Sequence, residues 1–133
     1  MPALQGGCLC TAVRYCLVGA PLHSVICHCR SCRKASAAPA VAWLTFKLES
    51  FQLLRGVPRS FRSSPGVVRT FCERCGTPLT YATEHTADSI DVTTVSLDDP
   101  TRFAPTQEVW LEHQLPWQLR NPRLEHCLRG SAP

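Results

Sequence analysis

The run Cys27-His28-Cys29-Arg30-Ser31-Cys32 decides the fold, because it brings three cysteines within six residues of a 133-residue chain. Two cysteine pairs lie far from it on either side. The first is in Gly6-Gly7-Cys8-Leu9-Cys10 and the second is in Phe71-Cys72-Glu73-Arg74-Cys75-Gly76. Residues two apart on an extended strand point to the same face, so both sulfurs of the first pair can reach one ion. The second pair has the spacing of a zinc knuckle, and the glycine after it can adopt the positive φ of a tight turn and leave its N–H free for a ligand sulfur.

Together the three clusters supply seven sulfurs, which is too many for one tetrahedral metal site and one too few for two closed sites. The spacing favours one closed site with four sulfurs and one open site with three. The two distant pairs suit the closed, structural site, because an ion that joins them closes a long loop and constrains the unfolded chain most. The predicted ligands of the structural zinc are Cys8, Cys10, Cys72 and Cys75. Those of the second zinc are Cys27, Cys29 and Cys32.

An open three-cysteine site leaves the fourth position of the metal to water or to a substrate atom, as in catalytic zinc centres. Three thiolates and Zn²⁺ carry a net charge of −1. Such a centre still binds a soft fourth sulfur ligand well, and it deprotonates a thiol that coordinates to it. The cations Arg30, Arg33 and Lys34 follow in sequence and could offset the negative charge. The predicted chemistry is therefore the activation of a thiol, or the addition of a thiol to a carbonyl group.

Other interpretations of the clusters stay open from the sequence. The triplet could be closed by His28 or Cys16, although His28 stands between two ligand cysteines and so points the other way on extended backbone. Both zinc sites could be purely structural, or the thiols could sense oxidants. A disulfide reductase is less favoured, because no thioredoxin-like βαβ pattern surrounds the cysteine pairs. Cys16 and Cys127 lack partners at ligand spacing and are expected to be packed or free thiols.

Length and composition predict one compact domain over residues 1–133. A hydrophobic content of 44% and a charged content of 18% exclude a disordered polyelectrolyte. No apolar run reaches the roughly 18 residues of a membrane span, and the first residues lack the basic start and apolar stretch of a secretory signal. The missing secretory pattern and the odd total of nine cysteines both count against disulfides. They favour metal-bound thiols in a reducing, cytoplasmic compartment.

The net charge of +4 suits an anionic small molecule and only weakly suits nucleic acid. Seven thiolates around two Zn²⁺ ions would lower the formal total to about +1, so the basic excess is weak evidence for any partner. The stretch 55–69 holds four arginines around Phe61 and could grip phosphates, as a non-enzymatic zinc module that binds nucleic acid or protein would. It is more typical of the solvated face of neighbouring strands, so nucleic acid is not the expected partner.

Short apolar stretches rich in β-formers predict an all-β fold of antiparallel strands. Proline and glycine separate these stretches. One short helix is expected over residues 29–37, just after the second cysteine cluster, and Pro39 disfavours its continuation. The tail from Asn121 carries two prolines and is expected to be loosely held. The predicted strands cover residues 12–15, 41–46, 51–54, 67–71, 79–82, 90–95 and 109–111.

With these motifs in this order, the chain resembles the glutathione-dependent formaldehyde-activating enzyme family, which includes centromere protein V. The three cysteine clusters carry the resemblance, and it extends over nearly the whole chain. The other matching segments are Val13-Arg14-Tyr15, Val95-Ser96-Leu97-Asp98-Asp99-Pro100 and Leu115-Pro116-Trp117.

The resemblance implies a β-tent of antiparallel sheets stabilised by zinc, with two zinc ions per chain on the two ligand sets named above. It also implies a carbon–sulfur lyase, similar to S-(hydroxymethyl)glutathione synthase, that acts on the adduct of a small thiol such as glutathione and an aldehyde such as formaldehyde. Cys27, Cys29 and Cys32 would then form the catalytic zinc site.

The chain departs from the family pattern at three positions. Thr11 and Ala37 stand where the family usually has glycine, and Glu108 stands where it often has histidine. None of the three is a predicted ligand, so the two predicted metal sites are unaffected.

Overall fold

The computed structural model describes residues 3–132, so Met1, Pro2 and Pro133 of the predicted domain lie outside the described part. Most elements are short strands, and one α-helix, α1 (Arg30–Ser36), stands among them. Within the described residues no helix is both long and apolar enough to cross a membrane. The strands are β1 (Leu4–Gly7), β2 (Arg14–Leu17), β3 (His23–Cys27), β4 (Val41–Lys47), β5 (Phe51–Arg55), β6 (Arg59–Ser64), β7 (Val67–Phe71), β8 (Pro78–Thr83), β9 (Ser89–Thr93), β10 (Gln107–Val109) and β11 (Glu125–His126).

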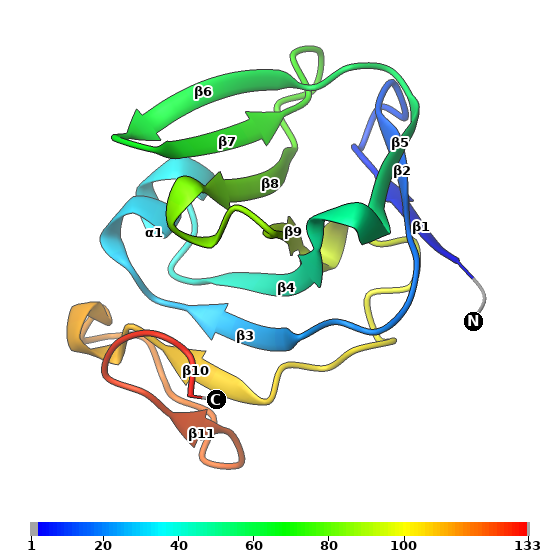
Figure 1. Ribbon diagram of the computed structural model, residues 1–133. Coiled ribbons are helices and arrows are strands. Elements are labelled where there is room, and N and C mark those ends of the chain that lie inside the picture. Colours follow the sequence, from blue (N-terminus) through cyan, green and yellow to red (C-terminus); the bar gives the residue numbers. More distant parts are fainter. Residues whose placement is uncertain (1–2, 133) are drawn as a thin grey trace.

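The strands form two sheets (Figure 1). The small sheet has the order β1-β2-β5, and the large sheet has the order β11-β10-β3-β4-β9-β8-β7-β6. The predicted all-β, antiparallel fold is confirmed for most pairs. The exceptions are the pairs of β10 with β3 and of β10 with β11, which are parallel. A long connection from β9 to β10 makes the first of these parallel pairs possible.

The strand β4 is covered on both faces, which explains its nearly continuous apolar sequence. Leu44 and Phe46 are fully buried in a core shared with Tyr15 and Leu17 of the small sheet. Trp43 points to the other face and belongs to a second core that also contains Cys27 and Cys32. The second cysteine cluster is therefore part of a hydrophobic core, since apolar side chains surround it.

Polar contacts hold the small sheet against the segment that follows β9. Gly6 pairs with Leu97 in an isolated bridge, and a Cβ at Gly6 would lie 2.5 Å from the Tyr15 hydroxyl. That hydroxyl lies 2.6 Å from Ser96 Oγ, and burial raises the pKa of Tyr15 to about 12. Arg14 donates to both carboxylate oxygens of Asp98, at 2.8 and 2.6 Å. These contacts fix the position of the turn after β1, which carries the first cysteine pair.

Several predicted strands differ from those observed. The expected strand at 12–15 starts later, as β2, because residues 8–13 form the turn of the first cysteine pair. The expected strand at 109–111 ends instead at Val109, because Trp110 adopts a left-handed φ of 58° and a 3-10 helix follows. The strands β1, β3, β6 and β11 were not predicted. Of these, β6 is largely exposed at the edge of its sheet and so shows no apolar alternation.

The C-terminal segment is held in place, contrary to the expected loose tail. Its backbone bonds with the β10 region, where the N–H of Cys127 donates to the carbonyl of Glu108. In addition, the backbone N–H of Asn121 is bonded to a carboxylate oxygen of Glu108, which is 2% exposed. The partners for the tail come from residues more than ten positions away, so the local pattern of the tail gave no sign of them.

The helix α1 agrees with the predicted range of 29–37. Cys29 is its N-cap, and its sulfur accepts a hydrogen bond from the backbone N–H of Cys32. Ala37 ends the helix in the left-handed conformation, with a φ of 50°, and its N–H bonds to the Arg33 carbonyl. This is the C-cap geometry for which glycine is best suited, and Thr11, the other departure from the family's glycines, also has a positive φ, of 66°.

We expect Ala37→Gly to raise the free energy of unfolding by roughly 0.5–1 kcal/mol, because glycine adopts the left-handed C-cap without steric strain. Urea denaturation of the zinc-loaded protein measures the change. The matched control is Ala35→Gly, inside the exposed face of the same helix, which should lower stability by about 1 kcal/mol. Equal losses in both variants would contradict the C-cap assignment.

Candidate functional site

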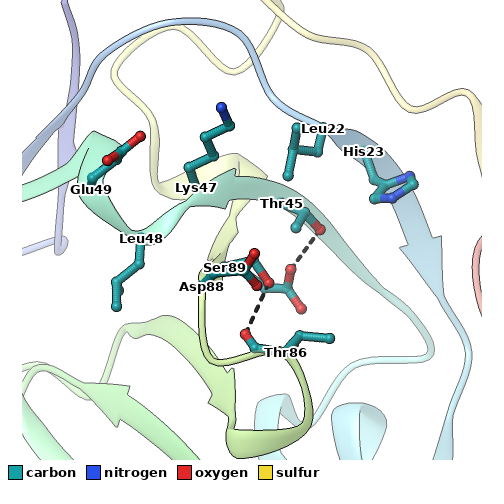
Figure 2. A pocket seen from close by; sticks show the side chains of 10 residues that line it. Leu22, His23, Thr45, Lys47, Leu48, Glu49, Thr86, Asp88 and Ser89 are labelled. Carbon is teal, nitrogen blue, oxygen red and sulfur yellow. Dashed lines mark hydrogen bonds between the residues drawn. The ribbon is translucent and has the colours of Figure 1, made fainter.

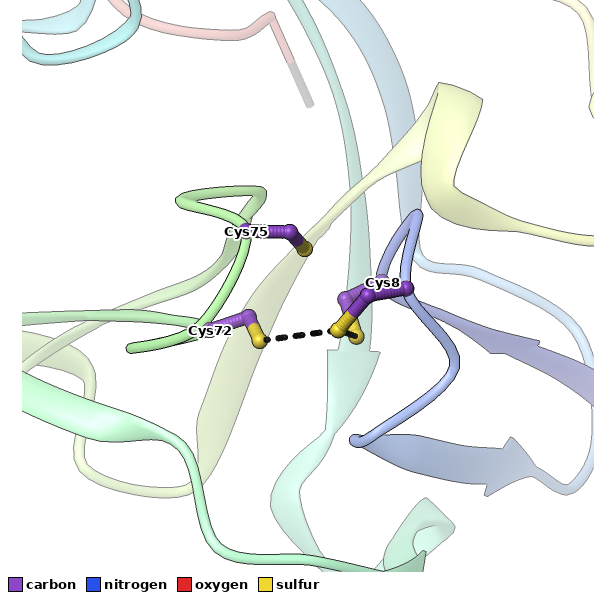
Figure 3. Close-up of side chains that lie close together, drawn as sticks. Cys8, Cys72 and Cys75 are labelled. Atoms are coloured by element: carbon purple, nitrogen blue, oxygen red, sulfur yellow. Dashed lines mark hydrogen bonds between the residues drawn. The ribbon is translucent and has the colours of Figure 1, made fainter.

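Two turns bring four sulfurs together, as Figure 3 shows for three labelled cysteines. Cys8 and Cys10 come from the turn after β1, and Cys72 and Cys75 come from the turn between β7 and β8. All four ligand atoms lie within 4.8 Å of one another. Thr77, which the sequence analysis did not single out, joins the turns: its hydroxyl accepts from the N–H of Leu9 and lies 3.2 Å from the sulfur of Cys75.

The spacing of these sulfurs fits a tetrahedral metal. Cys10 lies 3.7 Å from both Cys8 and Cys72, measured between Sγ atoms. Four sulfurs at the zinc–sulfur distance of about 2.3 Å lie about 3.8 Å apart, whereas a disulfide needs about 2.05 Å. All of the chain's cysteines are free thiols in the structure. The four-sulfur cluster therefore has the dimensions of a closed zinc site.

Backbone and side-chain donors surround the same sulfurs. Val13 N–H lies 3.2 Å from the sulfur of Cys8, and Arg74 N–H lies 3.4 Å from that of Cys72. Hydrogen bonds from the hydroxyl and the backbone of Thr77 lower the pKa of Cys75 to about 5. Gly76 has the expected positive φ, of 81°, but its N–H bonds to the carbonyl of Cys72 and not to a sulfur. Hydrogen-bond donors thus reach three of the four sulfurs, those of Cys8, Cys72 and Cys75.

The second cluster gathers its three sulfurs from one continuous stretch. Cys27 ends β3, Cys29 caps α1, and Cys32 lies in the first turn of the helix. The sulfurs of Cys27 and Cys32 are 3.7 Å apart, again the separation of two ligands of one tetrahedral ion. No fourth histidine, cysteine or carboxylate within residues 3–132 joins the three, so Cys16 is not a ligand here.

Without a cation the three sulfurs do not all ionise. Hydrogen bonds from the thiols of Cys27 and Cys32 lower the pKa of Cys29 to about 2, so this thiol ionises first. The same interaction with Cys29 raises the pKa of Cys27, and burial adds to that rise. A dication is the natural partner of such a site, because it favours the thiolate form of all three ligands.

His28 turns away from the sulfurs, as the alternation of side chains predicts. It is fully buried, and its Nε2 lies 2.8 Å from the carboxylate of Glu108. The other oxygen of this carboxylate accepts the N–H of Asn121. Glu108, one of the departures from the family pattern, therefore ties the loop of the second cluster to the C-terminal segment.

Arg69 on β7 is the cation nearest to the second cluster. Its Nη2 lies 3.7 Å from the sulfur of Cys32 and 3.2 Å from Ser31 Oγ, and its guanidinium lies 4.8 Å from the centre of the Tyr81 ring. Arg69 is only 8% exposed, so the interpretation of stretch 55–69 as a solvated face is wrong at this residue. Arg69 shares a strand face with the buried Val67, two residues earlier, so alternation along the strand indicates that it faces inward but not which residues it contacts.

The basic residues of α1 make no hydrogen bond to the sulfurs of the second cluster in the described part of the chain. The side chain of Arg33 donates to the carbonyls of His28 and His113 and thereby anchors the helix to the rest of the chain. Arg30 and Lys34 are exposed. The cation bonded to a sulfur of the second cluster is therefore Arg69, which is distant in sequence, and none of the three adjacent cations makes such a bond within the described residues.

A cavity of about 600 Å³ lies beside the second cluster. Ser31 and Arg69, which contact the sulfurs of Cys29 and Cys32, also line this cavity. Gly76, which follows Cys75 of the first cluster, also lines it. The cavity is called the inter-cluster pocket below, and it is the candidate substrate pocket.

A larger cavity, of about 850 Å³, contains no cysteine (Figure 2). It is lined by polar residues near Thr45, whose hydroxyl donates to the carboxylate of Asp91 at 2.6 Å. Burial raises the pKa of Asp91 despite that hydrogen bond. None of its lining residues is bonded to a sulfur of either cluster, whereas Ser31 and Arg69 of the inter-cluster pocket contact sulfurs of the second cluster, so the inter-cluster pocket is the better candidate.

The fold and the site define a class: a mainly antiparallel β protein with one cluster of four cysteines and one of three, each of a size that could hold a metal ion. A family model described as glutathione-dependent formaldehyde-activating enzyme matches residues 3–113. The chain belongs to that family.

Two other proteins are similar to this chain, one in sequence and one in fold. An uncharacterized lyase of Schizosaccharomyces pombe is 32% identical over 82 residues, which make up 62% of this chain and 59% of that protein. The chain thus spans about three fifths of the length of this relative. The crystal structure of a Rhodobacter sphaeroides protein matches with a TM-score of 0.62 at 20% identity, over 77% of this chain and 98% of the other, and shows the same fold.

We expect Cys8→Ser to lower the free energy of unfolding by about 4 kcal/mol or more, because it removes a buried ligand of the closed cluster. Urea denaturation measures the loss. Cys127→Ser, outside both clusters, should cost less than about 1 kcal/mol. If Cys8→Ser lowered the free energy of unfolding no more than this control does, the closed cluster would not stabilise the fold.

Proposed function

We propose that this protein is a zinc-dependent carbon–sulfur lyase that forms and cleaves the adduct of a small thiol and an aldehyde. One observation carries the proposal: three sulfurs converge with no fourth protein ligand among the described residues, beside a cavity that a substrate can enter. The family of formaldehyde-activating enzymes and the relative named a lyase both support chemistry of this class.

Two zinc ions per chain are part of the proposal. The closed cluster would hold a structural ion, and Cys27, Cys29 and Cys32 would hold the catalytic one. When bound, the second ion supplies a Lewis-acid position for a sulfur or an oxygen of the substrate. The sulfur–sulfur separations of 3.7 Å in both clusters support zinc, since they match a tetrahedral ion.

The reaction leaves oxidation states unchanged. In the direction of cleavage the carbon–sulfur bond breaks, sulfur keeps the bonding electrons, the hydroxyl proton goes to water, and the carbon–oxygen double bond forms. The departure of sulfur as a thiolate needs positive charge near the second cluster, and Arg69 supplies it beside Cys32. The core around Trp43 and Val109 excludes water from the buried side of the cluster.

Glutathione and formaldehyde are the substrates that the family name indicates, and we propose a small thiol of this kind with an aldehyde as the partners. We also propose a cytoplasmic location, since free thiols in number persist in a reducing compartment.

A non-enzymatic zinc module is the second candidate, because β6 presents exposed arginines around Phe61, which is 62% exposed. The basic stretch is weaker than its sequence indicated, however. Arg59 is paired with Glu73 at 3.4 Å, and Arg69 faces inward. Nucleic-acid binding that falls steeply with salt would favour this candidate.

We expect Cys29→Ser to lower kcat/KM for the glutathione–formaldehyde adduct by more than about 100-fold. Loss of a residue that only hydrogen-bonds to a metal ligand typically costs about 10- to 100-fold in activity, and loss of the ligand itself should cost more. The variant should retain the zinc of the closed cluster, as elemental analysis would show. Cys127→Ser should keep wild-type kinetics, since Cys127 is in neither cluster. Full activity in Cys29→Ser would overturn the proposed function.

A further inference from the structure

The inter-cluster pocket has an apolar wall much larger than a one-carbon aldehyde requires. Five elements meet around it: α1, β4, β6, β7 and β8. The apolar lining residues are Ala35, Trp43, Phe61, Phe71 and Pro78. At about 600 Å³ the pocket is about twenty times the roughly 30 Å³ that one water molecule takes up in the liquid.

The polar residues of the pocket select one kind of ligand. Lys34 and Arg69 contribute positive charge, and no acidic side chain lines the cavity. An ammonium group placed here would lack a counter-charge, because the other polar lining residues are uncharged serines and threonines. An apolar carbon body with one oxygen function fits the same wall.

Arg69 has a donor available for that oxygen. The Nε atom donates to Ser63 Oγ, and Nη2 donates to Ser31 Oγ and to the sulfur of Cys32. Within residues 3–132 neither Nη1 proton has a protein acceptor, and no carboxylate pairs with this guanidinium. A charged group that is nine-tenths buried and retains free N–H donors is suited to binding an oxyanion or a hydroxyl oxygen.

We propose that the aldehyde part of the adduct carries an apolar body, aryl or branched alkyl, which occupies the inter-cluster pocket while Arg69 Nη1 donates to the adduct's hydroxyl oxygen. This deepens the proposed function and rests on it. As the carbon–sulfur bond breaks, sulfur leaves with both bonding electrons, the hydroxyl proton passes to water, and Arg69 stabilises the negative charge that develops on oxygen before the carbonyl forms.

Binding of stable thioethers to the zinc-loaded protein tests the pocket without turnover. By calorimetry we expect S-benzylglutathione to bind about tenfold more tightly than S-methylglutathione, because the phenyl ring is removed from water. Phe61→Ala should reduce this ratio to below about threefold. The control Leu54→Ala removes an exposed apolar residue of β5 outside the pocket and should keep the ratio. Equal affinities of the two thioethers in the wild type would overturn the inference.

Turnover separates this inference from the proposed function. We expect the benzaldehyde–glutathione adduct to be cleaved with a higher kcat/KM than the formaldehyde adduct, and Ala35→Phe, which narrows the pocket, to lower that preference at least tenfold. Cleavage of the formaldehyde adduct alone would overturn the inference and keep the proposed function. A benzyl preference in binding with no cleavage of either adduct would overturn the proposed function and keep the apolar pocket.

Discussion

The crowding of thiol sulfurs is the constraint on which the rest of the structure depends. Seven sulfurs lie in two groups whose members come within 4.8 Å of one another, and thiols so close cannot all ionise unless a cation neutralises them. The closed group joins residues more than sixty positions apart, so an ion held there fixes the small sheet and the β7–β8 turn relative to each other. A short chain buries a smaller fraction of its surface than a large domain does, so its hydrophobic core contributes less stability. The binding free energy of the ion would add to it.

The two clusters differ because their surroundings differ. The closed one lies between two turns joined by Thr77, where backbone N–H groups reach the sulfurs. The open one lies against a core with Trp43 and beside a buried arginine. The inter-cluster pocket adjoins both clusters, because its lining includes Ser31 and Arg69, which contact sulfurs of the open cluster, and Gly76, which follows Cys75 of the closed one. The same constraint thus supports both architecture and chemistry.

Much of this arrangement could be predicted from the sequence, because metal ligands leave a local signature. The partition of four and three cysteines, the helix after Cys29 and the antiparallel strands all follow from spacing and short-range pattern. Arg69 could not be placed in this way, since its partners Ser31 and Cys32 lie almost forty residues away and only strand register brings them together. The C-terminal segment was missed for the same reason: its order depends on the buried carboxylate of Glu108, a contact with no trace in local composition.

Zinc K-edge X-ray absorption on the purified wild-type protein tests the central claim most directly, because it counts sulfur neighbours around the metal. We expect two zinc ions per chain that share seven sulfurs at about 2.3 Å and one oxygen or nitrogen, the light atom completing the open site. A single zinc with four sulfurs, or a protein without zinc and with its second cluster oxidised, would contradict it.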